Sequence, residues 1–200
     1  MRTDVANVYG SPLEARVFSI HAEDAVERAV RLDAACIVAN LLSVPGHPEL
    51  KEASIKTVLD LRAAADSYAM PFMIEPLVMQ DNTKGGYMVD GDADKIVTLV
   101  RLAVELGADL VKADPTTNTE DYHRVIQTAG TIPVLVRGGG KTSDQELLKR
   151  TEAVLQQGAR GIVYGRNVVQ HHDPVGITRA LMTVLHEGVS AEVALAGIAT

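Results

Sequence analysis

The strongest constraint on the fold is an alternation, repeated along the chain, of short β-branched apolar runs with longer segments whose apolar residues recur at helical spacing. This alternation is typical of parallel βαβ units. The predicted strands are near-continuous apolar runs, as expected for strands buried on both faces. They lie at 36–42, 71–78, 110–113, 133–137 and 161–164, preceded by one at 16–20 or at 4–9.

The predicted helices between these strands have recognisable ends. Apolar residues over 96–106 form one stripe that stops at Gly107, a residue suited to the left-handed position after a helix. Ser143 and Glu146 have the spacing of a capping box. Asp173 is the expected N-cap of a helix whose first turn contains a proline. The rhythm is continuous, without linkers or repeats, and therefore predicts one domain.

The number of strands limits the choice of α/β fold. A closed (β/α)8 barrel takes eight strands and typically about 250 residues, whereas about six strands can be placed in this chain of 200 residues. A doubly wound dinucleotide-binding sheet should show a GxGxxG turn after its first strand, and the sequence has none. We therefore expect a single domain over residues 1–200 that is either an open sheet or a barrel with strands missing.

Charge and hydropathy argue against two kinds of partner. The net charge is −7, from 26 acidic and 19 basic residues without a Lys/Arg block, so we expect no binding to nucleic acid. The longest stretch without charge, residues 34–48, contains Pro45 and Gly46 and is shorter than the roughly 20 residues that a membrane span needs. No apolar region follows Arg2 and Asp4 as it would in a signal peptide. We expect a cytoplasmic protein that binds no membrane.

A lysine inside a short apolar strand is the most informative candidate for chemistry. Lys112 lies in the predicted strand 110–113, where an ammonium group must snorkel, find a partner or lose its proton. A lysine whose pKa falls from about 10.4 towards 7 or 8 offers a free amine that attacks carbonyl carbons and forms a Schiff base. The residues alone leave open a structural interpretation, an ion pair with Asp114 or another carboxylate.

A buried carboxylate is predicted on a neighbouring strand. Glu75 lies within the apolar run 71–78. With a raised pKa it could act as a general acid or base, and with Lys112 it could form a proton-transfer pair. A purely structural salt bridge between the same two residues is the alternative.

Two successive strand ends are rich in glycine and suggest an anion site. Consecutive glycines let backbone N–H groups approach an anion closely, and the loops after the last two strands of a (β/α)8 barrel commonly bind phosphate. Taken singly, the glycines could serve a tight turn and the arginine a surface ion pair. Together they predict a phosphorylated substrate. The residues are Gly138, Gly139, Gly140, Gly165 and Arg166.

The neighbouring histidines do not indicate a metal site. His171 and His172 are adjacent and point in different directions, and Asp173 is better explained as an N-cap. We predict no metal and no other cofactor.

At this point the chain resembles a known family, the class I (Schiff-base) aldolases of the DhnA/DeoC type. This group includes archaeal-type fructose-bisphosphate aldolases, autoinducer-2 phosphate thiolase and tagatose-bisphosphate aldolases. The resemblance spans about residues 19–188 and implies a TIM barrel that cleaves a carbon–carbon bond in a phosphorylated sugar or keto compound. It is carried by Gly107-Ala-Asp-Leu-Val-Lys112, by Pro133-Val-Leu-Val-Arg-Gly-Gly-Gly-Lys141, by Gly158-Ala-Arg-Gly-Ile-Val-Tyr-Gly-Arg-Asn167, and by Gln170 and Asp173-Pro174.

The resemblance also implies roles for individual residues. Lys112 is similar to the Schiff-base lysine, and Glu75 to the proton-handling glutamate of tagatose-type members. The tyrosine that archaeal-type members use there is missing from this chain. Asp114, at the end of the lysine strand, is a third catalytic candidate. The glycines and Arg166 at the two strand ends would hold the substrate phosphate.

One departure from the family concerns the start of the chain. Family members begin with two βα units, the first bearing a catalytic aspartate in an Asp-His-Gly motif, whereas this chain resembles them from about the third strand onward. We therefore expect a (β/α)8 barrel lacking its first two βα units, and a homo-oligomer, because open sheet edges are prone to pairing. A thiolase or transaldol-type transferase using the same lysine, and a non-catalytic phosphate-ligand binder, are the alternative functions.

Overall fold

The computed structural model describes residues 1–7 and 16–198 of the chain. Its strands are β1 (Asp4–Asn7), β2 (Arg16–His21), β3 (Ile37–Ser43), β4 (Phe72–Asp81), β5 (Tyr87–Val89), β6 (Leu110–Ala113), β7 (Val134–Arg137) and β8 (Gly161–Val163). Its α-helices are α1 (Ala25–Arg31), α2 (Pro48–Ser67), α3 (Ala93–Glu105), α4 (Tyr122–Ala129), α5 (Asp144–Gln156), α6 (Arg166–Val169), α7 (Pro174–Met182) and α8 (Ala191–Ala196). A 3₁₀ turn (Thr119–Asp121) precedes α4, and a π-helical turn (Thr183–Glu187) extends α7.

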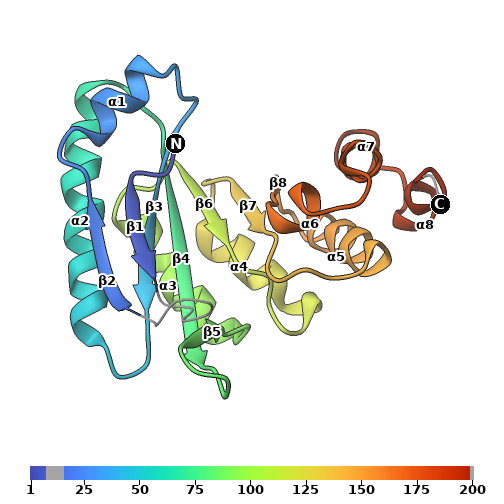
Figure 1. Ribbon diagram of the computed structural model, residues 1–200, viewed down its shortest axis with the longest axis horizontal. Coiled ribbons are helices and arrows are strands. Elements are labelled where there is room, and N and C mark those ends of the chain that lie inside the picture. The colour runs from blue at the N-terminus through green and yellow to red at the C-terminus, as the bar shows by residue number, and fades with distance from the viewer. Residues whose placement is uncertain (8–15, 199–200) are drawn as a thin grey trace.

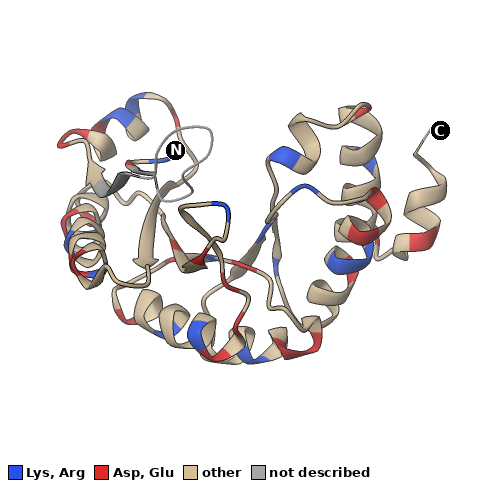
Figure 2. Cartoon of the chain, turned by 60° about the horizontal axis from the view of Figure 1, so that its bottom comes forward, with Lys and Arg blue, Asp and Glu red and all other residues tan. Residues whose placement is uncertain are grey.

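The main sheet is parallel and has the strand order β3-β4-β6-β7-β8, with the short β5 antiparallel to β4. Successive parallel strands are joined through helices (Figure 1). The helices form an arc around the outer side of the strands, and this arc is open on one side (Figure 2). This is the architecture of a (β/α)8 barrel that is not closed within the described residues.

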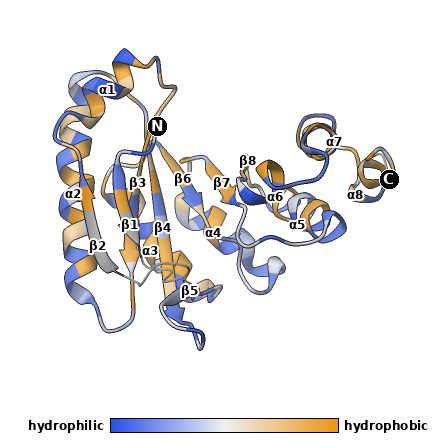
Figure 3. Ribbon diagram, viewed as in Figure 1, coloured by the Kyte–Doolittle hydropathy of each residue, from blue (hydrophilic) through white to orange (hydrophobic). Residues whose placement is uncertain are grey.

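The strands belong to the core, as their apolar composition predicts. Residues Phe72–Met79 of β4 are buried without interruption, which is the pattern of a strand covered on both faces. Hydrophobic and hydrophilic residues alternate along the helices (Figure 3). In α3, for example, Ile96, Leu99, Val100 and Ala103 are buried.

The predicted helix ends are confirmed. Helix α3 is followed by Gly107 in the left-handed region, with φ of 88°. Ser143 and Glu146 form the capping box of α5. Asp173 accepts a hydrogen bond from the N–H of Gly176 at 2.9 Å and caps α7.

The N-terminal strands differ from the prediction of one further parallel strand. Both candidate segments, 4–9 and 16–20, contain strands, but these strands, β1 and β2, pair with each other antiparallel in a separate sheet. Residues 8–9 of the candidate 4–9 lie outside the described residues. A single parallel bridge joins Arg2 to Val38 of β3. After Arg2 the chain leaves β3, and β1 pairs with β2 instead. The register of this pairing shifts between Ala6 and Asn7.

Within the described residues, no helix is both long and apolar enough to span a bilayer.

Candidate active site

Strand register brings the predicted chemical residues to one level of the parallel sheet. Asn40 of β3 is the partner of Glu75 of β4, and Ile74 is the partner of Val111 of β6. The next residues along these two strands, Glu75 and Lys112, are therefore neighbours. Because side chains alternate between the faces of a strand, both side chains project from the same face of the sheet.

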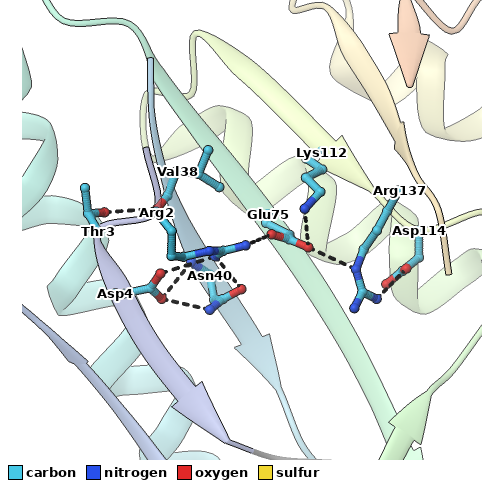
Figure 4. A network of polar contacts seen from close by, with 9 residues as sticks. All are labelled: Arg2, Thr3, Asp4, Val38, Asn40, Glu75, Lys112, Asp114 and Arg137. Carbon is cyan, nitrogen blue, oxygen red and sulfur yellow. Dashed lines mark hydrogen bonds and ion pairs between the residues drawn. The ribbon is translucent and has the colours of Figure 1, made fainter. Parts of the chain in front are cut away.

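Lys112 and Glu75 are in direct contact. The Nζ atom of Lys112 lies 3.0 Å from Oε1 of Glu75, and the two side chains are 14% and 2% exposed (Figure 4). Of the carboxylates left open by the sequence, Glu75 is thus the partner of the lysine. Asp114 instead accepts a hydrogen bond from Arg137 at 2.8 Å.

The charge state of Glu75 corrects the prediction of a raised pKa. Burial acts to raise the pKa of this carboxyl group, but the adjacent Arg2, Lys112 and Arg137 outweigh burial and lower it. The Nε atom of Arg137 lies 3.0 Å from Oε1 of Glu75, so this oxygen faces two cations. Glu75 is therefore an ionised carboxylate placed to stabilise a positive charge on the lysine nitrogen.

Asp114 has the raised pKa that the sequence suggested for Glu75. Burial raises the pKa of Asp114, and the attraction of Arg137 only partly compensates. Its Oδ1 atom is bound to Arg137, whereas its buried Oδ2 atom has no hydrogen-bond partner among the described residues. An unpaired buried oxygen is costly unless it is protonated or meets a ligand.

Four further residues of this network were not assigned roles from the sequence. Like Lys112, Arg137 is a cation in a predicted apolar strand. Asn40 is a polar residue within the apolar run of β3. No local pattern could have identified Arg2 and Asp4, because they reach Asn40 and Glu75 from far away in the chain.

The glycine loops after β7 and β8 are joined by side chains, which brings the predicted phosphate residues together. Arg166 donates a hydrogen bond to the carbonyl of Gly139 at 3.0 Å, rather than forming an ion pair. The amide of Asn167, another residue without a role assigned from the sequence, donates to the carbonyls of Gly138 and Gly140 at 3.2 and 3.1 Å. With these carbonyls held, no hydrogen bond within the described residues uses the N–H groups of Gly139, Gly140 or Gly165.

Packing accounts for two of these glycines and leaves two without a structural reason. Gly139 has a φ of 63°, and a Cβ on Gly138 would lie only 3.0 Å from the ring of Tyr164. Gly140 and Gly165 have no left-handed φ, and a Cβ at either would meet nothing within 4 Å. The space on the Cβ side of these two glycines is therefore open.

The two parts of the site are continuous along the chain. Arg137, in contact with Glu75 and Asp114, is followed directly by Gly138. The lysine network and the glycine loops thus meet where β7 ends. This is the end of the strands at which (β/α)8 barrels carry their active sites.

The histidines lie beside this region. His171 contacts both carboxylate oxygens of Asp144 at 3.0 Å. Its ring lies 4.2 Å from that of His172, so the expectation that the two histidines point in different directions is wrong. No group of three His, Cys, Asp or Glu side chains in the described part of the chain is arranged to hold a metal ion.

Comparison with known proteins identifies the class that this fold and site define. The model of the DeoC/LacD family of aldolases matches residues 4–171. An uncharacterized aldolase of Saccharolobus solfataricus is 34% identical over 189 residues, which are 93% of this chain and 68% of that protein. The 2-amino-3,7-dideoxy-D-threo-hept-6-ulosonate synthase of Halobacterium salinarum is 32% identical over 86% of this chain and 61% of that protein.

A solved structure agrees with these sequence matches. A study of the mechanism of the Schiff base forming fructose-1,6-bisphosphate aldolase provides a structure that is 26% identical, with a TM-score of 0.76. The match covers 93% of this chain and 70% of that one. The fold is that of the TIM-barrel aldolases, as predicted. The chain belongs to the DeoC/LacD aldolase family.

Proposed function

We propose that the protein is a class I aldolase that cleaves or forms a carbon–carbon bond in a phosphorylated sugar or keto compound through a Schiff base on Lys112. The observation that carries this proposal is the buried contact of 3.0 Å between Lys112 Nζ and Glu75 Oε1. Membership of the aldolase family supports the reaction class. The homologous structure named for a Schiff base forming aldolase supports the mechanism.

The first step requires a neutral amine. Ionised Glu75 accepts a proton from the Lys112 ammonium group, and the free amine attacks the substrate carbonyl. Glu75 returns this proton to the departing hydroxyl of the carbinolamine, and loss of water gives a protonated imine, whose positive charge then faces the Glu75 carboxylate. Because this charge develops in a site of low exposure, the fixed carboxylate stabilises it without reorganising water.

The protonated imine is the electron sink for bond cleavage. A base removes the proton of the hydroxyl on the carbon β to the imine, and the O–H electron pair forms the carbonyl group of the released product. The bond between the α and β carbons breaks, and its electron pair moves toward the imine to form an enamine. Protonation of the enamine and hydrolysis return the lysine. Glu75 and Asp114 are the proposed proton carriers, Glu75 as the base and Asp114, with its unpartnered Oδ2, as a group that can exchange a proton with the substrate.

The glycine loops are proposed to bind the substrate phosphate. The open space beside Gly140 and Gly165 supports this assignment, as do their N–H groups, which make no hydrogen bond to other described residues. Arg166 adds a positive charge, and Gly138 and Gly139 shape the loop. The substrate would then reach from this phosphate site to Lys112.

Reductive trapping tests the proposal. Borohydride is added in the presence of dihydroxyacetone phosphate or a panel of phosphorylated sugars, and the protein is analysed by intact mass and peptide mapping. We expect a substrate-sized adduct on Lys112, lost in Lys112→Arg and retained in the control Lys56→Arg, an exposed lysine of α2. An adduct only on another lysine would contradict the assignment to Lys112. The absence of any adduct on folded protein would contradict the Schiff-base mechanism.

A turnover assay with the same substrates separates cleavage from group transfer. An aldolase releases the aldehyde product with or without an acceptor, whereas a transferase turns over only when an acceptor is supplied. The relative from Halobacterium salinarum is named a synthase, so the acceptor panel includes aldehydes of several chain lengths.

A further inference from the structure

The first residues of the chain enter the network of Glu75 and Lys112. The N–H of Thr3 donates to the carbonyl of Val38 at 3.0 Å, and the N–H of Val38 donates to the carbonyl of Met1 at 2.8 Å. The hydroxyl of Thr3 donates to the same carbonyl of Val38 at 3.0 Å. These bonds fix the backbone on both sides of Arg2 against β3.

The side chain of Arg2 is braced by two residues and ends on Glu75. Its guanidinium donates to Oδ1 of Asn40 at 2.8 Å, to Oδ1 of Asp4 at 3.2 Å and to Oε2 of Glu75 (Figure 4). Asp4 in turn accepts hydrogen bonds on Oδ2 from the backbone and side-chain amides of Asn40, both at 2.9 Å. Arg2, Asp4 and Asn40 therefore form a closed frame around the guanidinium.

The contacts of Glu75 are divided between its two oxygens. Arg2 binds Oε2, whereas Lys112 and Arg137 contact Oε1. We propose that Arg2 is a positioning residue of the active site, which holds Oε2 of Glu75 so that Oε1 faces Lys112 and the carboxylate stays charged. This inference rests on the proposed function, in which Glu75 accepts the proton of the lysine.

The effect of Arg2 on Glu75 can be measured as a change in the pKa of the Glu75 carboxyl group. The charged groups that act on Glu75 are Arg2 from the N-terminal segment, Lys112 from β6, Asp114 after β6 and Arg137 from β7, and Asp4 of β1 contacts Arg2. Removing Arg2 removes one of three cations and leaves Oε2 without its partner. An opposite charge in contact lowers a carboxyl pKa by about 1–3 units, so we expect the pKa of Glu75 to rise by about one unit or more.

The experiment uses the whole chain of residues 1–200 with its purification tag at the C-terminus, away from Arg2. Arg2→Gln removes the charge and keeps an amide donor, Arg2→Lys keeps the charge, and Arg101→Ala, an exposed arginine of α3, is the control. The first readout needs no substrate: the titration of the Glu75 side-chain carbon is followed by NMR in 13C-glutamate-labelled protein. The second is the rate of Lys112 labelling by dihydroxyacetone phosphate and cyanoborohydride as a function of pH.

We expect Arg2→Gln to raise the Glu75 midpoint and the acid limb of the labelling profile by about one pH unit. In Arg2→Gln, labelling of Lys112 should be about tenfold slower on that limb than in wild type. Arg2→Lys should restore most of the lost rate. Arg101→Ala should change neither the Glu75 midpoint nor the labelling rate. An unchanged midpoint in folded Arg2→Gln would overturn the inference even if the wild type is labelled. If the wild type is not labelled by any substrate, the proposed function fails and the midpoint alone decides the role of Arg2.

A second variant covers the case in which Arg2→Gln does not fold. Asn40→Ala keeps the arginine but removes one side of its frame, so the Glu75 midpoint should move in the same direction by a smaller amount. No movement in folded Asn40→Ala would overturn the inference.

Discussion

Glu75 and Asp114 of the candidate active site are both buried, yet the pKa values of their carboxyl groups shift in opposite directions. Glu75 contacts Arg2, Lys112 and Arg137, and these cations lower its pKa despite burial. Asp114 contacts Arg137 and is repelled by Glu75, so burial prevails and its pKa is raised. The number of cations in contact, rather than burial alone, therefore decides which of the two stays ionised.

The raised pKa of Asp114 predicts a pH-dependent effect of Asp114→Asn on folding stability. A carboxyl group whose pKa is higher in the folded state contributes stability that is complete below its unfolded pKa of about 3.9 and is lost as pH rises through its folded value. Asparagine does not titrate and keeps an oxygen for Arg137. We expect the free energy of unfolding of Asp114→Asn, relative to wild type, to increase from about pH 4 to pH 8.

Urea unfolding at a series of pH values measures this difference. Asp60→Asn, which replaces a carboxylate on the surface of α2, is the control for the loss of one negative charge. A difference between Asp114→Asn and wild type that is constant or shrinks as pH rises would contradict the prediction.

At the scale of secondary-structure elements, the glycine loops are shaped by the helices that follow them. Arg150 of α5 donates to the carbonyl of Gly138 at 2.8 Å. Asn167 of α6 binds the carbonyls of Gly138 and Gly140 and accepts from the N–H of Thr142 at 3.0 Å. One amide side chain thus connects the loop after β7 with the helix after β8.

Asn167→Ala should weaken recognition of the phosphate more than the chemistry at the lysine. Loss of these hydrogen bonds costs about 1–3 kcal/mol of buried polar pairing and releases the loop. We expect the dihydroxyacetone phosphate concentration for half-maximal Lys112 labelling to rise about tenfold. Labelling by dihydroxyacetone, which has no phosphate, should change much less. Asn118→Ala, at the 3₁₀ turn before α4, is the control, and an equal loss with both substrates would contradict the role in phosphate binding.

The elements were more predictable from the sequence than the contacts between them. Periodicity and capping residues identified the strands of the parallel sheet and the ends of α3, α5 and α7, because these signals are local. The antiparallel pairing of β1 with β2 was not predicted, since apolar patterning does not specify which strand is the partner. Lys112 and Glu75 stood out as charges in apolar strands, whereas Arg2 is separated from Glu75 by 73 positions and no local rule connects them.

At the scale of the whole molecule, the open arc leaves the two ends of the parallel sheet in different environments. At one end, residues 1–3 lie along β3. At the other end, β8 pairs within the described residues with β7 alone. The helices that follow β8 expose several large apolar side chains: Val169 at 74%, Val175 at 65%, Met182 at 49% and Val193 at 64%.

These features predict that the protein is a homo-oligomer whose contact involves the helices after β8. An unpaired strand edge and exposed large apolar side chains are both stabilised by burial against another chain. Light scattering coupled to size-exclusion chromatography should give a multiple of the chain mass. The double variant Val175→Glu and Val193→Glu should reduce it, because charges introduced into an apolar contact are costly to bury. Leu59→Glu, a substitution at an equally large exposed apolar residue on α2, should leave the mass unchanged. A monomeric wild type at micromolar concentration would contradict the prediction. If only Leu59→Glu dissociated the oligomer, the contact would involve α2 and not the helices after β8.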